Sequence, residues 1–160
     1  MKITRNQSGF TLIEMVITAV VLGIIAAMAI PGFFRAMQKI KLNATTRDIT
    51  SDLRWARSKA ISSRTPVGLC FDFANKSYAV FLDTDDPGSY QYDATNDSTV
   101  ETNGLNDLAN ASSTFNNNTV IFKPDGTCYA SGTITCVSSD SSHSKVVDIL
   151  ASTGRIKITS

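Results

Sequence analysis

The first third of the chain is dominated by one long run of apolar residues. From Met15 to Phe34 no side chain is charged. A run of this length matches the ~20 residues that an α-helix needs to cross a ~30 Å hydrocarbon core. Its length and its place near the start favour a membrane-spanning helix over the buried helix of a soluble protein. We therefore predict a membrane anchor over residues 10–34.

Helical periodicity continues beyond the apolar run. Small or apolar residues recur at steps of three and four between charged positions, which predicts an amphipathic helix; they are Leu42, Thr46, Ile49, Leu53, Ala56 and Ala60. Ser62, Ser63 and the following Pro66 indicate its end. The anchor is thus expected to continue as an amphipathic half over residues 35–64. Together they form a helix of ~80 Å at 1.5 Å per residue.

After Pro66 the apolar pattern changes to a period of two, which is typical of β-strands. Five strands and their turns are expected, at residues 67–73, 78–82, 119–122, 132–137 and 145–150, with a sixth at 155–158. Residues 83–118 are polar and predict a long, irregular, variable loop. The predicted fold class is therefore α+β: a long N-terminal helix packed against an antiparallel β-sheet head over residues 65–160.

The charge of the chain is small overall but unevenly distributed. Fifteen basic and fourteen acidic side chains give a net charge of +1. The head from Thr65 to Ser144 has only two cations, Lys76 and Lys123, whereas the last segment is basic. Arg155 and Lys157 alternate with isoleucines there, so both should face solvent from one strand. An acidic head argues against a large nucleic-acid surface, and two cations provide only a weak contact with phosphate.

The residues before the apolar run form a specific pattern. A short basic leader ends at Gly9, Phe10 and Glu14 open the run, and Gly23 and Pro31 lie inside it. A cleaved secretory signal fits poorly, because Glu14 interrupts the run and no A-x-A site follows it. This pattern resembles the N-terminus of type IV pilins and type II secretion pseudopilins.

The resemblance implies how the N-terminus is processed and used. Prepilin peptidase would remove residues 1–9 after Gly9 and methylate Phe10. A carboxylate in lipid costs several kcal/mol unless it is paired, so Glu14 is expected to pair with the Phe10 amine of a neighbouring subunit in a filament. The alternative is a carboxylate that stays hydrated at the helix end. Gly23 and Pro31 are expected to loosen the helix locally.

Three later segments add a second resemblance, to H-type (GspH/FimT-like) pseudopilins and minor pilins. They are "LRWARSKAISSRTPVGLCFD", "VIFKPDG" and "VVDILASTGRIKI". Such subunits help to initiate or cap a pilus or pseudopilus, usually near its tip. The implied partners are prepilin peptidase, other pilins and an inner-membrane assembly platform. The implied location is the bacterial inner membrane, single-pass, with the head in the periplasm.

Two other functions remain open from the sequence. FimT-like subunits of some competent bacteria bind DNA through a basic C-terminal motif, and "GRIK" at 154–157 resembles it. Arg155 and Lys157 would then contact DNA, whereas basic side chains that merely protect an edge strand are the simpler interpretation. A third hypothesis is an ordinary anchored periplasmic protein whose leader only mimics a prepilin.

Three cysteines follow the anchor, where an oxidising compartment would allow a disulfide. Cys128 and Cys136 are equally spaced about Gly132, so a hairpin there would place them opposite each other. Three single pairings are possible, and the sequence alone does not choose among them. We favour a Cys128–Cys136 bridge over no bridge, which leaves Cys70 as a buried free thiol.

The sequence offers little evidence for a metal, a cofactor or catalysis. Four carboxylates lie close together, but Pro87 stands at a ligand position and no later Glu completes a calcium loop; they are Asp83, Asp85, Asp86 and Asp93. A solvated acidic turn is the preferred interpretation over a calcium site. The single histidine, His143, lies in a serine-rich loop without a catalytic motif. We expect no cofactor and no enzymatic activity.

Overall fold

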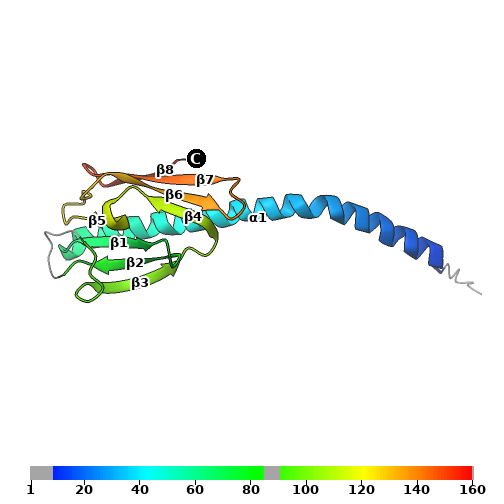
Figure 1. Cartoon of the computed structure of the whole chain (residues 1–160), viewed down its shortest axis with the longest axis horizontal. Coiled ribbons are helices and arrows are strands. Elements are labelled where there is room, and N and C mark those ends of the chain that lie inside the picture. Colours follow the sequence, from blue (N-terminus) through cyan, green and yellow to red (C-terminus); the bar gives the residue numbers. More distant parts are fainter. Residues whose placement is uncertain (1–8, 85–90, 160) are drawn as a thin grey trace, which may run out of the picture. The chain divides into compact units, whose positions relative to one another are not determined.

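The long helix predicted at the start of the chain is present as α1, Leu12–Ser63 (Figure 1). The structure is a computed structural model that describes residues 9–84 and 91–159. Two units, Met1–Met37 and Gln38–Ser160, divide the chain and are described separately. Most of the predicted leader, residues 1–8, lies outside the described residues.

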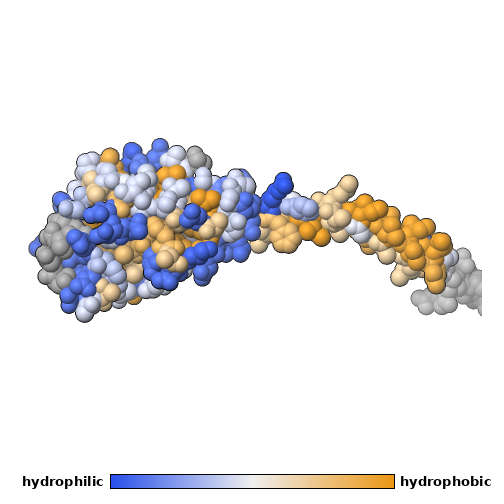
Figure 2. All heavy atoms as spheres, in the orientation of Figure 1, coloured by the Kyte–Doolittle hydropathy of each residue, from blue (hydrophilic) through white to orange (hydrophobic). Residues whose placement is uncertain are grey.

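The part of α1 in the first unit has a fully exposed apolar surface. Every described residue up to Met37 is exposed, and Figure 2 shows that apolar residues cover this part of the helix. Among the described residues, α1 is the helix long and apolar enough to cross a membrane. This exposed surface is consistent with a membrane anchor, because lipid would cover it.

In the second unit, α1 buries one face against the head. The predicted seam is confirmed, since all six of its residues are buried. The structure adds Thr45 and Thr50 to this face. The Thr46 and Thr50 hydroxyls donate to the carbonyl oxygens of Leu42 and Thr46, both at 2.7 Å. These bonds let threonine replace an apolar residue in the seam without leaving a buried hydroxyl unpaired.

One antiparallel sheet has the strand order β3-β2-β1-β5. Its strands are β1 Val67–Asp72, β2 Ser77–Leu82, β3 Ser98–Gly104 and β5 Thr119–Phe122. A short 3-10 helix, η1 Asn116–Asn118, precedes β5. β1 and β2 form the predicted hairpin, in which Val67 pairs with Leu82 and Asp72 with Ser77. Val67, Leu69 and Phe71 alternate along β1 toward the core. Gly68 and Phe81 pair on the opposite face and are also buried, so this sheet is covered in part on both faces.

The second antiparallel sheet has the order β4-β6-β7-β8. Its strands are β4 Leu108–Ser113, β6 Gly132–Ser138, β7 Ser144–Leu150 and β8 Arg155–Thr159. β7 and β8 form the predicted closing hairpin, with Leu150 opposite Arg155. The α+β class and the antiparallel head are therefore confirmed, although the head has two sheets.

The prediction of an irregular segment over residues 83–118 is wrong in part. β3 and β4 both lie in it, as an outer strand of each sheet. β3 has no buried residue, so no alternation of apolar and polar side chains marks it. Polar edge strands of this kind are paired by neighbouring strands rather than by burial of their own side chains.

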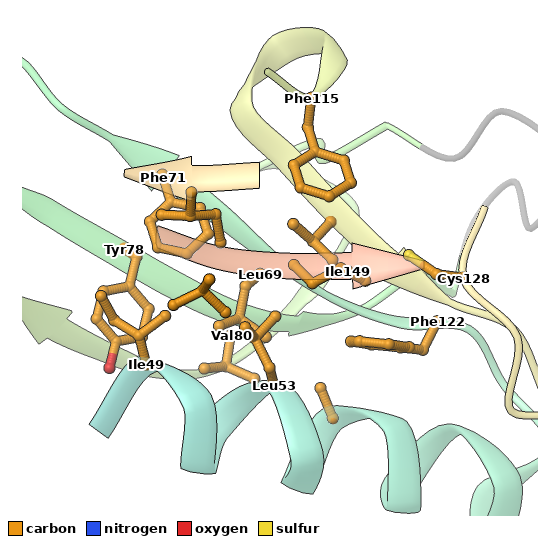
Figure 3. Packing of buried hydrophobic residues seen from close by; sticks show 14 of the residues in the cluster. Ile49, Leu53, Leu69, Phe71, Tyr78, Val80, Phe115, Phe122, Cys128 and Ile149 are labelled. Atoms are coloured by element: carbon orange, nitrogen blue, oxygen red, sulfur yellow. The ribbon is translucent and has the colours of Figure 1, made fainter. Parts of the chain in front are cut away.

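A single core joins the second half of α1 to both sheets. Figure 3 shows Ile49 and Leu53 pointing from the helix toward Leu69 and Val80 of the first sheet. Ile149 of the second sheet belongs to the same cluster. Each such fully buried aliphatic side chain stabilises the fold by roughly 1.5–3 kcal/mol. The core therefore holds the helix end and the two sheets as one unit.

Candidate functional site

The start of α1 carries the residues predicted for processing and assembly. Gly9 and Phe10 precede the helix, and Phe10 is 79% exposed. Thr11 caps the helix, because its Oγ1 accepts a hydrogen bond from the Glu14 amide at 3.3 Å. Thr11 and Glu14 thus occupy the two positions of a capping box, in which a carboxylate is favoured by the helix dipole. The sequence interpretation missed Thr11 as the helix cap, although the spacing T-x-x-E signals it.

Gly23 and Pro31 lie within the exposed apolar part of α1. The helix continues through both residues. A side chain added at Gly23 would meet nothing within 4 Å, so no contact with the described residues requires glycine there. Their predicted effect on helix flexibility stays a prediction.

Arg155 and Lys157 lie on one exposed face of β8, as expected. β8 is an outer strand, and its residues alternate between exposed and half-buried. Asp148 of β7 stands directly opposite Lys157 in the register. The two cations are therefore brought together, but an acidic residue shares their face of the sheet.

A junction around Arg57 is the feature of the head that sequence reasoning missed. Its Nε donates to the Gly126 carbonyl oxygen at 2.8 Å and its Nη2 to that of Thr153 at 2.9 Å. Gly126 and Gly154 have φ values of 81° and 60°, which L side chains rarely adopt. A Cβ at Gly154 would overlap the Gly126 carbonyl oxygen and lie 2.9 Å from Arg57 Nε.

The Arg57 junction brings together three segments that are distant in the sequence. Arg57 lies in "LRWARSKA", Gly126 ends "VIFKPDG" and Gly154 lies in "ASTGRIKI". One guanidinium joins the end of α1 to the turn after β5 and to the β7–β8 turn. The second of these turns immediately precedes Arg155, so the junction sets the position of the basic strand.

The predicted Cys128–Cys136 disulfide is absent, and all three cysteines are free thiols. Cys70 is half-buried rather than buried as predicted. The hairpin about Gly132 is not formed. Gly132 instead begins β6, where a Cβ would lie 2.9 Å from the Phe115 ring. The backbone of Cys128 instead forms an isolated antiparallel β-bridge with that of Phe122. The Cys128 Sγ donates a hydrogen bond to the Ile121 carbonyl oxygen at 3.3 Å. Burial raises the pKa of the Cys128 thiol and raises that of Cys136 to about 11, so both stay protonated at neutral pH.

Two of the four weak calcium candidates, Asp85 and Asp86, lie outside the described residues. Asp83 is fully buried, unlike a residue of a solvated turn. Asp93 is exposed and accepts hydrogen bonds from the Thr95 amide and the Asn96 side chain, which lower the pKa of its carboxyl. Within residues 9–84 and 91–159 no group of three His, Cys, Asp or Glu side chains is arranged to hold a metal ion.

His143 lies in the turn between β6 and β7, where it takes part in a local hydrogen-bond network. Its Nδ1 is 2.6 Å from the Ser142 hydroxyl, which also lies 2.7 Å from Asp140 Oδ2. A catalytic triad needs the imidazole between the hydroxyl and the carboxylate, whereas here the hydroxyl lies between them. The network therefore stabilises the turn. Hydrogen bonds from the Ser138 hydroxyl, and then from the Ser142 hydroxyl and amide, lower the pKa of Asp140 to about 2.

Comparison with known proteins identifies two matching families. The model of the type II transport protein GspH matches residues 45–154, more than half of the chain. The model of the prokaryotic N-terminal methylation motif matches residues 4–30. No relative among curated proteins matches this chain in sequence.

Solved structures with the same fold include a pilin and a pseudopilin. The type IV minor pilin FimU of Pseudomonas aeruginosa has a TM-score of 0.61 and 16% identity, over 76% of this chain and 90% of that one. The minor pseudopilin EpsH of the Vibrio cholerae type 2 secretion system has a TM-score of 0.57 and 13% identity, over 75% and 97%. At this identity the likeness shows the fold, and the family models show membership. The chain belongs to the GspH family of type II transport proteins, as an H-type pilin or pseudopilin with an N-terminal methylation motif, and is a structural subunit rather than an enzyme.

Proposed function

We propose that the chain is a minor pilin or pseudopilin that initiates or caps a type IV pilus or a type II secretion pseudopilus. The observation that carries this proposal is the start of α1. Phe10 follows Gly9 inside the methylation motif, and Glu14 lies on the first turn of α1, directly before the exposed apolar part of that helix. A capping box alone does not require twenty exposed apolar residues after it, whereas an anchor that moves from a bilayer into a filament does.

The proposed order of events follows from these parts. Prepilin peptidase removes residues 1–9 and methylates Phe10, and α1 holds the chain in the inner membrane with its head in the periplasm. At the assembly platform, Glu14 exchanges its lipid surroundings for the Phe10 amine of a neighbouring pilin, with Gly23 and Pro31 allowing the helix to adjust. Residues 10–34 then form the assembly helix, residues 35–64 its head-bound continuation, and residues 65–160 the surface that neighbouring subunits meet.

Filament recovery tests this function. In cells that make prepilin peptidase, the chain is expected in the sheared filament fraction together with the other pilins. In peptidase-deficient cells it should stay in the inner membrane, because its leader keeps a polar segment on the cytoplasmic side. Recovery in the filament fraction without the peptidase, or a chain that never leaves the membrane with it, would contradict the proposal.

DNA binding is the second candidate function, favoured by the shared exposed face of Arg155 and Lys157 on β8. We expect the Arg155→Ala/Lys157→Ala variant to lose any DNA affinity that falls with salt, since two phosphate contacts give a log–log slope of about −2. Electrophoretic mobility shifts across a salt series measure it. The matched control is Arg64→Ala, an exposed cation outside β8. Equal binding by the double variant and the control would exclude β8 as the DNA site.

A further inference from the structure

The side of the head away from β8 has a groove between α1 and the outer strand β3. One hollow, of about 360 Å³, is lined by Asp48, Asp52, Tyr78, Glu101 and Asp107 among others. A second hollow, of about 140 Å³, lies beside it and adds Trp55 and Val100. Ser51, Asp52 and Glu101 line both hollows, so the two form one groove along the strand.

The groove is acidic and its central carboxylate is held in place. Asp52 Oδ2 accepts hydrogen bonds from the Tyr78 hydroxyl at 2.6 Å and from Asn103 Nδ2 at 3.1 Å. Burial and the nearby Asp52 raise the pKa of Tyr78, so the phenol remains a donor. Lys41 forms an ion pair with Asp107 at 2.9 Å. The carboxylates of Asp48 and Glu101 remain exposed beside this fixed centre.

The walls of the groove offer more than charge. β3 is the outermost strand of its sheet, with β2 as its single neighbour, so one row of its backbone N–H and C=O groups faces outward. Trp55 is 43% exposed and Val100 48% exposed. An extended segment laid along β3 would therefore meet backbone hydrogen-bonding groups, an apolar surface and carboxylates at once.

The same chain carries a segment with the complementary chemistry. β8 is also an outer strand, and it presents Arg155 and Lys157 from one exposed face. Residues two apart along a strand are separated by ~7 Å. At this separation the two cations could each meet a different carboxylate of the groove. Arg155 can in addition stack on an exposed indole such as Trp55. No other described strand alternates two cations in this way.

We propose that the α1–β3 groove of one subunit receives β8 of a second copy of this chain. This inference rests on the proposed role as a filament subunit and identifies one head-to-head contact of that role. The donor and acceptor surfaces are different parts of the molecule, so the contact is heterologous.

Charge reversal tests the proposal with the full-length chain in detergent. Sedimentation velocity across a salt series should show self-association of the wild-type chain that weakens as salt increases. Glu101→Lys and Lys157→Glu should each weaken it at least about tenfold, because each places like charges together. The combined variant should recover part of it, because the two reversed charges then attract each other. Arg64→Glu, at an exposed cation outside both the groove and β8, is the matched charge-reversal control and should associate as the wild type does.

The outcomes separate this contact from the filament role itself. Three results would each overturn the groove proposal. The first is self-association that neither single reversal weakens, the second is a wild-type chain that remains monomeric, and the third is a combined variant that associates no better than the single reversals. Filament recovery of the reversal variants is a separate measurement. If the wild-type chain never enters filaments while its reversals behave as expected in solution, the filament role fails and the contact stands.

Discussion

The Glu14→Val variant is expected to insert into the membrane normally but to be recovered in filaments at about one tenth of the wild-type amount or less. Valine removes the charge that is costly in lipid, so insertion becomes easier. It also removes the partner proposed for the Phe10 amine of the neighbouring subunit. Loss of ~1.4 kcal/mol at one contact already lowers occupancy tenfold. The measurement is the ratio of the chain in the sheared fraction to that in the membrane.

The Glu14→Gln variant separates the two roles of this side chain. Glutamine retains the capping position, because glutamine also serves at N3 of a capping box, but it has no charge to pair with an amine. We expect Glu14→Gln to fail in assembly as Glu14→Val does. Thr18→Val, which changes an exposed residue of the same helix whose hydroxyl bonds only to its own turn, should assemble normally. Normal incorporation of Glu14→Gln would leave helix capping as the sole role of Glu14.

The Gly154→Ala variant should destabilise the head by about 2–4 kcal/mol, which corresponds to a fall in Tm on the order of 10 °C. The added methyl group would overlap the Gly126 carbonyl oxygen, and the φ of 60° is unfavourable for alanine. To relieve the overlap, one of the two turns must move and break its hydrogen bond with Arg57. Its partly buried carbonyl oxygen then lacks a charged donor. Thermal unfolding of the full-length chain in detergent, followed by circular dichroism, measures the effect.

Gly104→Ala is the matched control for this loss of stability. Gly104 ends β3, has no positive φ, and an added Cβ would meet only the Asn106 side chain, at 3.1 Å. We expect a fall in Tm of a few degrees at most, because a surface side chain can move aside. Equal effects of the two substitutions would show that the Arg57 junction does not stabilise the head more than an ordinary turn.

Elements with a clear apolar period were predictable from the sequence, and polar elements were not. The seam of α1 and the β1–β2 hairpin bury their apolar positions as the pattern requires. β3, with the sequence STVETNG, buries nothing, so its strand state depends on the neighbour that pairs with it. The Cys128–Cys136 error has a similar cause, because Gly132 was interpreted as a turn glycine when it is needed to make room for Phe115.

The candidate residues show the same difference. Gly9, Phe10 and Glu14 could be proposed from the sequence because their spacing before an apolar run is a local pattern. Arg57 was not, because its partners are the carbonyl oxygens of Gly126 and Thr153, which are distant in sequence and invisible in composition. The groove between α1 and β3 was equally hidden, since it depends on β3 being an outer strand.

Intact-mass spectrometry of the chain purified from cells that contain prepilin peptidase tests the central claim most directly. The filament role predicts a mature chain that begins at Phe10 and carries one added methyl group on its N-terminal amine. A Gly9→Ala variant, in which the cleavage site is altered, should retain residues 1–9 and stay in the membrane. A chain that begins at Met1 in the wild type, with its leader intact and Phe10 unmethylated, would contradict the claim and favour an ordinary anchored protein.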